Sequence, residues 1–152
     1  MDIGSSYLPS ELVSAFLYAQ MEQAEQIIAK RRTLFDLYYD LLKPLEDDGF
    51  IRLPYIGSDC TSNGHIFYIV SNSLTERIML IAHLKLAGIY AVFHYVPLHS
   101  SYGGKQFGRV SGTMDVTDNI SDRLLRLPLY YEMSDVDVRF VAKNIDEFYR
   151  TL

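Results

Sequence analysis

The sequence predicts an α+β protein in which a small sheet is covered by helices, and three observations lead to this prediction. Four short runs rich in β-branched or aromatic residues alternate with longer segments of helical periodicity. The links between these segments are short, and no internal repeat is present. The chain has 152 residues, 49% hydrophobic and 22% charged, which is enough for a single domain with a buried core.

The first half of the chain is expected to form a long helix followed by two strands. Apolar residues at i, i+3 and i+4 predict a helix from Ser10 to about Lys43, with a break near Ala24–Ala29. Pro44 and Gly49 are expected to end it, because proline interrupts a helix and glycine favours its C-terminal turn. The expected strands are 51–53 and 65–70, with a loop at 57–59 between them.

The second half is expected to contain two capped helices, a shorter helix and two further strands. Ser73-x-x-Glu76 and Ser134-x-x-Asp137 have the pattern of N-terminal capping motifs, and Gly88 is expected to end the first of these helices. Residues 102–113 are rich in glycine and serine and are expected to be a mobile surface loop. The remaining expected elements are strands at 90–95 and 124–129, a helix at 116–123, and an apolar stripe on the last helix formed by Val138, Val141, Ile145, Phe148 and Tyr149.

Composition excludes several classes of function. A net charge of -5 argues against a nucleic-acid partner, and the basic run Lys30-Arg31-Arg32 is expected to be a solvated helix face. No apolar run approaches the length of a membrane span, so no membrane partner is expected and the expected location is the cytoplasm. Cys60 is the only cysteine, which excludes an intramolecular disulfide and a cysteine-based metal cluster. No metal site is expected.

The most unusual string is His94-Tyr95-Val96-Pro97-Leu98-His99, at the end of an expected strand. His94 and Tyr95 precede the turn that Pro97 imposes, and His99 follows it. Functional side chains often lie at the ends of strands. The string is equally compatible with a structural cluster. Gly103-Gly104-Lys105 lacks the spacing of a phosphate-binding loop, and a flexible loop is the preferred interpretation.

Several motifs together resemble the DegT/DnrJ/EryC1/StrS sugar aminotransferases over nearly the whole chain. They are the opening 4–12 (Gly-Ser-Ser-Tyr-Leu-Pro-Ser-Glu-Leu), the helix with Gln20, Arg31-Arg32 and Tyr38-Tyr39, then His65-x-Phe67-Tyr68, 88–99 and Leu125-x-Leu127-Pro128-Leu129. The last three keep their order and spacing. The resemblance implies a mostly antiparallel sheet, as in the C-terminal domain of fold type I transferases that use pyridoxal phosphate (PLP).

The resemblance also implies a function for the complete enzyme. It implies a homodimer that uses PLP to move an amino group from glutamate to the nucleotide sugar dTDP-4-keto-6-deoxyhexose. Ser6 stands where most relatives have an asparagine that reaches the cofactor phosphate of the neighbouring subunit, so Ser6 is the cofactor-binding candidate. His94, Tyr95 and His99 are the substrate-binding candidates.

The lysine that would hold PLP is expected to lie outside this chain. The five lysines are Lys30, Lys43, Lys85, Lys105 and Lys143, and none has the sequence context that the family gives its Schiff-base lysine. Residues 1–152 are therefore expected to be one small C-terminal domain, inactive by itself and without covalent PLP, whose large domain is absent. Two alternatives remain: a stand-alone module that binds nucleotide sugars or another protein, and a subunit that completes another chain's active site. Self-association is expected through helices around Phe16, Tyr18, Phe35 and Tyr38.

Overall fold

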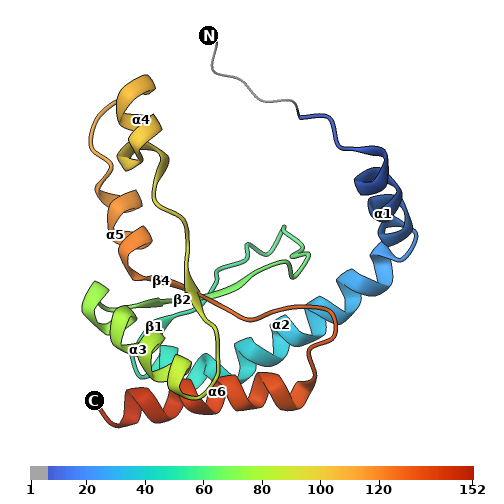
Figure 1. Ribbon diagram of the computed structural model, residues 1–152. Coiled ribbons are helices and arrows are strands. Elements are labelled where there is room, and N and C mark those ends of the chain that lie inside the picture. Colours follow the sequence, from blue (N-terminus) through green and yellow to red (C-terminus); the bar gives the residue numbers. More distant parts are fainter. Residues whose placement is uncertain (1–6) are drawn as a thin grey trace.

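A computed structural model describes residues 7–152 and confirms the α+β class (Figure 1). All strands belong to one sheet in the order β1-β2-β4-β3, and every neighbouring pair is antiparallel, as the resemblance implied. In chain order the elements are α1 (Glu11–Met21), α2 (Ala24–Asp47), β1 (Ile51–Arg52), β2 (Phe67–Ser71), α3 (Leu74–Leu86), β3 (Val92–Phe93), the 3-10 helix η1 (Leu98–Ser100), α4 (Tyr102–Phe107), α5 (Asp115–Arg123), β4 (Leu124–Leu127) and α6 (Asp135–Arg150).

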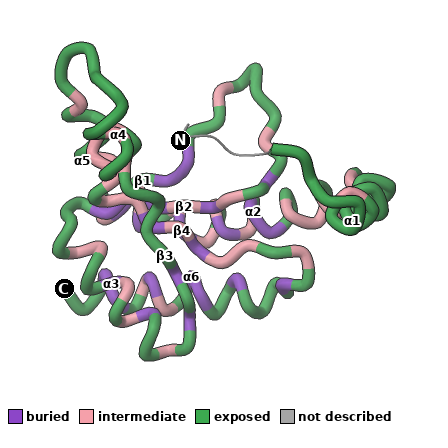
Figure 2. The backbone as a smooth tube through the Cα atoms, turned by 45° about the horizontal axis from the view of Figure 1, so that its top comes forward, coloured by how far each residue is buried: buried purple, intermediate pink, exposed green. Residues whose placement is uncertain are grey.

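One face of the sheet packs on helices α2, α3 and α6 and forms the core (Figures 1 and 2). The register pairs Phe67 with Leu127 and Ile69 with Leu125, and all four side chains are buried. Directly paired residues share a face, and successive residues alternate between faces. Tyr68 and Arg126 therefore lie together on the opposite face, which these three helices leave open.

The long N-terminal helix differs from the prediction at both the break and the end. The break falls at residues 22–23, just before the expected Ala24–Ala29. Helix α2 continues through Pro44 to Asp47 because Leu42 and Leu45 anchor its last turns in the core. Gly49 then adopts a φ of +80°, a conformation that glycine tolerates, and closes the helix as predicted.

Two aromatic residues expected at an association surface belong to the core instead. Phe35 and Tyr38 are buried, and their rings pack on Phe67 with centroid distances of 4.8 and 5.0 Å. The Tyr38 hydroxyl donates a hydrogen bond to the Pro128 carbonyl at 3.0 Å, and burial raises the pKa of this phenol well above its usual value. Helical spacing alone could not separate a core stripe from a contact stripe.

Both serine caps are confirmed. Ser73 accepts a hydrogen bond from the Glu76 N–H at 3.1 Å. Ser134 and Asp137 form a complete capping box, in which the hydrogen bonds to the carboxylate lower the pKa of Asp137. The apolar stripe predicted on α6 is buried throughout.

Residues 90–113 contain the largest departures. The strand expected at 90–95 is reduced to Val92–Phe93, because β3 is an edge strand that pairs only with β4. Residues 102–107, expected to be loop, form helix α4, whose N-terminus is capped by the Ser101 hydroxyl accepting from Gly104 N–H at 3.0 Å. A Cβ on Gly104 would collide with the Leu98 carbonyl, so this glycine allows close packing rather than a flexible loop.

Helix α1 is an exposed apolar arm (Figure 2). None of its residues is buried, although six of eleven are large and apolar. These six side chains are 52–77% exposed and are Leu12, Val13, Phe16, Leu17, Tyr18 and Met21. A helix that is apolar on most sides is normally covered by protein, whereas the apolar side chains of α1 are exposed here.

Candidate functional site

A row of three side chains crosses the open face of the sheet. The register places Tyr68 of β2 opposite Arg126 of β4, and Arg126 opposite Val92 of β3. His94 follows directly after the end of β3 and borders the same space as Tyr68 and Arg126. The sequence motif and the central strands therefore meet on one surface.

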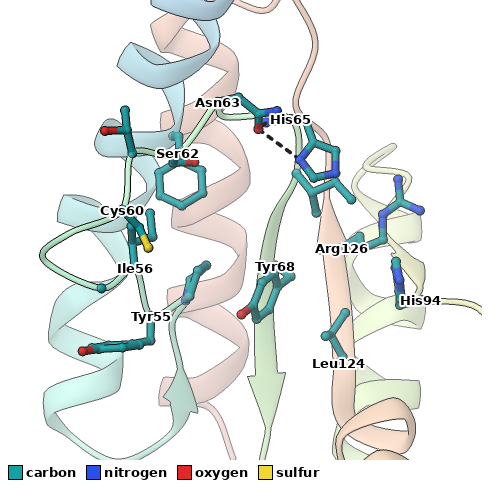
Figure 3. A pocket seen from close by; sticks show the side chains of 15 residues that line it. Tyr55, Ile56, Cys60, Ser62, Asn63, His65, Tyr68, His94, Leu124 and Arg126 are labelled. Carbon is teal, nitrogen blue, oxygen red and sulfur yellow. Dashed lines mark hydrogen bonds between the residues drawn. The ribbon is translucent and has the colours of Figure 1, made fainter.

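A cavity of about 730 Å³ lies between this open face and the chain segment that joins β1 to β2 (Figure 3). Figure 3 shows Tyr55, Ile56 and Cys60 along one side and Arg126 and His94 along the other, with Tyr68 between them. The volume is typical of pockets for small organic ligands. Its lining is Phe35, Pro54, Tyr55, Ile56, Gly57, Cys60, Thr61, Ser62, Asn63, His65, Ile66, Tyr68, His94, Leu124 and Arg126.

The polar side chains that line the cavity include a positive charge and no negative charge. One guanidinium, two imidazoles, hydroxyl groups and one amide are present, and no aspartate or glutamate contributes to the lining. The Nδ1 atom of His65 lies 3.2 Å from the Asn63 side-chain oxygen, which holds the imidazole in place. A cavity with cationic and neutral donors and no carboxylate favours a negatively charged ligand.

Arg31 holds the wall of the cavity in place and corrects the prediction of a solvated basic face. Its guanidinium donates hydrogen bonds to the carbonyls of Gly64 at 3.0 Å, His65 at 2.5 Å and Leu129 at 3.2 Å. Gly64 has a φ of +63°, and a Cβ there would lie 2.9 Å from the Arg31 backbone. Arg31 thus ties α2 to both the segment entering β2 and the segment leaving β4. Sequence reasoning missed this role because the partners are backbone atoms far along the chain.

The structure separates the substrate-binding candidates. His94 lines the main cavity, and its ring stacks edge-on against Tyr95 with centroids 5.2 Å apart. Tyr95 faces a neighbouring cavity of about 610 Å³ that His94 also lines. His99 lies elsewhere, half-buried beside α4, with its Nε2 2.9 Å from the Asp118 carboxylate of α5. The cofactor-binding candidate Ser6 lies outside the described residues.

None of the five lysines lines the main cavity. Lys30 and Lys143 lie 4.0 and 3.5 Å from carboxylates of Asp135 and Glu147. Hydrogen bonds to Asp47 and Glu46 raise the pKa of Lys43, whereas a Schiff-base lysine must lose its proton before it attacks. The remaining two, Lys85 and Lys105, are exposed on helices.

Other kinds of site are not evident in residues 7–152. No group of three or more histidine, cysteine, aspartate or glutamate side chains in this range could hold a metal ion. No helix of the same range is both long and apolar enough to cross a membrane. His83 has a structural environment, with Nε2 3.1 Å from the Asn144 carbonyl and its ring beside Phe148.

This helix-covered antiparallel sheet is a fold found in aminotransferases. The Helicobacter pylori PseC aminotransferase, involved in the biosynthesis of pseudoaminic acid, superimposes with a TM-score of 0.80 at 19% identity, over 100% of this chain and 40% of that one. DesV of S. venezuelae, in complex with a ketimine intermediate, gives a TM-score of 0.78 at 23% identity, over 88% of this chain and 35% of that one.

The sequence identifies the family. The model of the DegT/DnrJ/EryC1/StrS aminotransferase family matches residues 1–146, and the chain belongs to this family of PLP-dependent sugar aminotransferases. Similar proteins include the dTDP-4-dehydro-2,3,6-trideoxy-D-glucose 4-aminotransferase of Saccharopolyspora spinosa, which is 26% identical over 99% of this chain and 37% of that protein. The UDP-4-amino-4-deoxy-L-arabinose–oxoglutarate aminotransferase of Shewanella sediminis is 28% identical over 95% of this chain and 39% of that protein. The chain thus spans less than two fifths of the length of these relatives.

Proposed function

We propose that this chain is the small C-terminal domain of a PLP-dependent nucleotide-sugar aminotransferase and is inactive without a large domain that carries the Schiff-base lysine. One observation carries the proposal: nearly all of the chain matches only 37–39% of its relatives. The five lysines lack the sequence context that the family gives its Schiff-base lysine, which supports the proposal. When bound, PLP supplies the electron sink for amino transfer.

The proposed reaction of the assembled enzyme is amino transfer from glutamate to a dTDP-4-keto-6-deoxyhexose. Within the family, the motifs at 5–8 and 91–99 resemble those of dTDP-4-amino-4,6-dideoxygalactose transaminase, which serves polysaccharide pathways such as enterobacterial common antigen. The proposed assembly is a homodimer. In it this chain would bind and orient the substrate through His94, Tyr95 and His99, and Ser6 would contact the cofactor phosphate.

The genomic sequence immediately 5′ of the Met1 codon is the first test, and co-expression is the second. We expect an open reading frame for a large PLP domain, and the two products together should transfer an amino group from glutamate to dTDP-4-keto-6-deoxyglucose. The chain alone should give neither this activity nor a borohydride-reducible PLP adduct. An adduct at one specific lysine of the folded chain would contradict the proposal. No upstream large domain would favour the stand-alone module.

Replacing His94 or His99 by alanine in the assembled enzyme should reduce turnover with little change in melting temperature. His94 is exposed on the cavity wall, so its loss removes a ligand contact and no core packing. The His99 side chain is only 15% exposed and contacts Asp118, so His99→Ala should lower the melting temperature more than His94→Ala does. Paired kinetics and thermal melts check this. A large fall in stability, with activity lost only in proportion to folded protein, would assign both residues a structural role.

A further inference from the structure

Arg126 is a half-buried arginine whose guanidinium forms no hydrogen bond or ion pair among the described residues. Four arginines of residues 7–152 are neither buried nor fully exposed: Arg31, Arg77, Arg123 and Arg126. Arg31 binds three carbonyls, Arg77 donates to the Ser121 carbonyl and lies over the Phe93 ring, and Arg123 donates to Asn119. The guanidinium of Arg126 takes part in none of the hydrogen bonds or ion pairs formed among the described residues. The guanidinium nitrogens of Arg126 remain accessible, because among the described residues only Arg77 Nε is buried without a partner, so a ligand can reach them and supply the anion.

The surroundings of Arg126 are built for an anion. The imidazole of His65 borders both the main cavity and the smaller hollow next to it, and Arg126 lines the same two spaces. His94 lies beside Arg126 in Figure 3. Asn63 contacts the His65 imidazole and the Arg31 guanidinium binds the His65 carbonyl, and together they hold His65 at this end of the cavity. No carboxylate of the lining competes for the guanidinium.

The opposite side of the cavity is aromatic and apolar. Tyr55, which is 90% exposed, offers an uncovered ring, Pro54 and Ile56 continue this side, and Tyr68 lies between it and Arg126. Flat rings stack on such surfaces, whereas an inorganic anion would occupy only a small part of about 730 Å³. The cavity therefore combines a site for a charged group with a site for a planar one.

We propose that Arg126, flanked by His65 and His94, is the anchor for the diphosphate of a nucleotide whose base lies toward Tyr55 and Tyr68. A guanidinium suits this role because its N–H groups match two phosphate oxygens at once. The inference rests on the proposed function for its ligand class, and it assigns to the small domain a nucleotide-binding role that persists without the lysine domain.

Titration calorimetry on the 152-residue chain tests the proposal with three probes: thymidine diphosphate, inorganic pyrophosphate and thymidine. Thymidine diphosphate should bind most tightly, and each of the other two should bind more weakly because each lacks half of the contacts. Arg126→Gln should weaken binding of the diphosphate by about tenfold or more and leave thymidine binding unchanged. Arg126→Lys, which keeps the charge but not the two-pronged geometry, should fall between the two.

Arg52→Gln is the matched control, because Arg52 is an exposed arginine on the outer strand β1 of the same sheet. It should bind thymidine diphosphate as the unmodified chain does, and circular dichroism should show equal folding of all variants. Equal binding by the Arg126→Gln and Arg52→Gln variants would overturn the proposal. So would a folded chain that binds neither thymidine diphosphate nor pyrophosphate, which would indicate that a carboxylate of another domain occupies Arg126.

The two proposals can fail separately. If the co-expressed enzyme is active but the chain binds nucleotides without regard to Arg126, only the anchor is wrong. If the chain binds thymidine diphosphate through Arg126 but no large domain restores amino transfer, the aminotransferase proposal is wrong and the stand-alone nucleotide-sugar module gains support.

Discussion

Replacing Arg31 by alanine is expected to lower the free energy of unfolding by about 3 kcal/mol, because three backbone carbonyls lose a charged donor at once. For a chain of this size the melting temperature should fall by roughly 9 °C. Urea denaturation and thermal melts measure both quantities. The effect should be larger than that of a surface arginine, because the guanidinium binds carbonyls of residues that lie 33, 34 and 98 positions after Arg31 in the sequence.

Arg32→Ala is the control for this prediction. Arg32 is the next residue on the same helix, carries the same charge and is exposed, so its replacement should change stability by less than about 0.5 kcal/mol. Hydrogen exchange adds a local readout: amide protons of residues 64–67 should exchange faster in the Arg31 variant than in the Arg32 variant. Indistinguishable stabilities and exchange rates for the two variants would show that the three Arg31 hydrogen bonds contribute nothing to stability.

The chain by itself is expected to self-associate through α1, and Phe16→Glu should weaken this association by a hundredfold or more. The proposed occupant of α1 in the complete enzyme is the missing large domain, because the chain accounts for under two fifths of its relatives' length. Without that domain, a second copy is the available apolar partner. Leu12 and Phe16 lie one turn apart on the helix and are 77% and 74% exposed.

Sedimentation velocity over a range of concentrations measures the association. Gln20→Glu serves as the control, since it adds the same charge to an exposed polar position of α1. It should associate nearly as well as the unmodified chain. An unmodified chain that stays monomeric at high concentration would refute the prediction. A Phe16→Glu variant that associates normally would place the self-association contact outside α1.

Local signals in the sequence were sufficient for most of the helices. Ser73 and Ser134 lie three residues before an acidic partner, and such caps work within one helical turn, so they act wherever they occur. The stripe on α6 was equally readable because every member returns to one face at helical spacing. The strands expected at 51–53 and 124–129 from composition and bounding turns are present at the shorter ranges 51–52 and 124–127.

Local signals failed where distant segments decide the outcome. Pro44 does not end α2, because Leu42 and Leu45 are anchored in a core that the sequence does not display. Gly103-Gly104-Lys105 lies in a helix, because Gly104 must pack closely on Leu98. The stretch 90–95 forms only two residues of strand, because β3 has a pairing partner on one side alone.

The candidate site divides in the same way. The family, its fold and the string containing His94 were determined by the sequence, since motif order and spacing are properties of the chain itself. Only the tertiary structure placed Tyr68, Arg126 and His94 on one open face, paired His99 with Asp118, and made Arg31 a clamp rather than a solvated charge. The physical reason is that burial and charge pairing depend on which residues meet in space, and strand register and helix packing decide those meetings over separations that no local pattern spans.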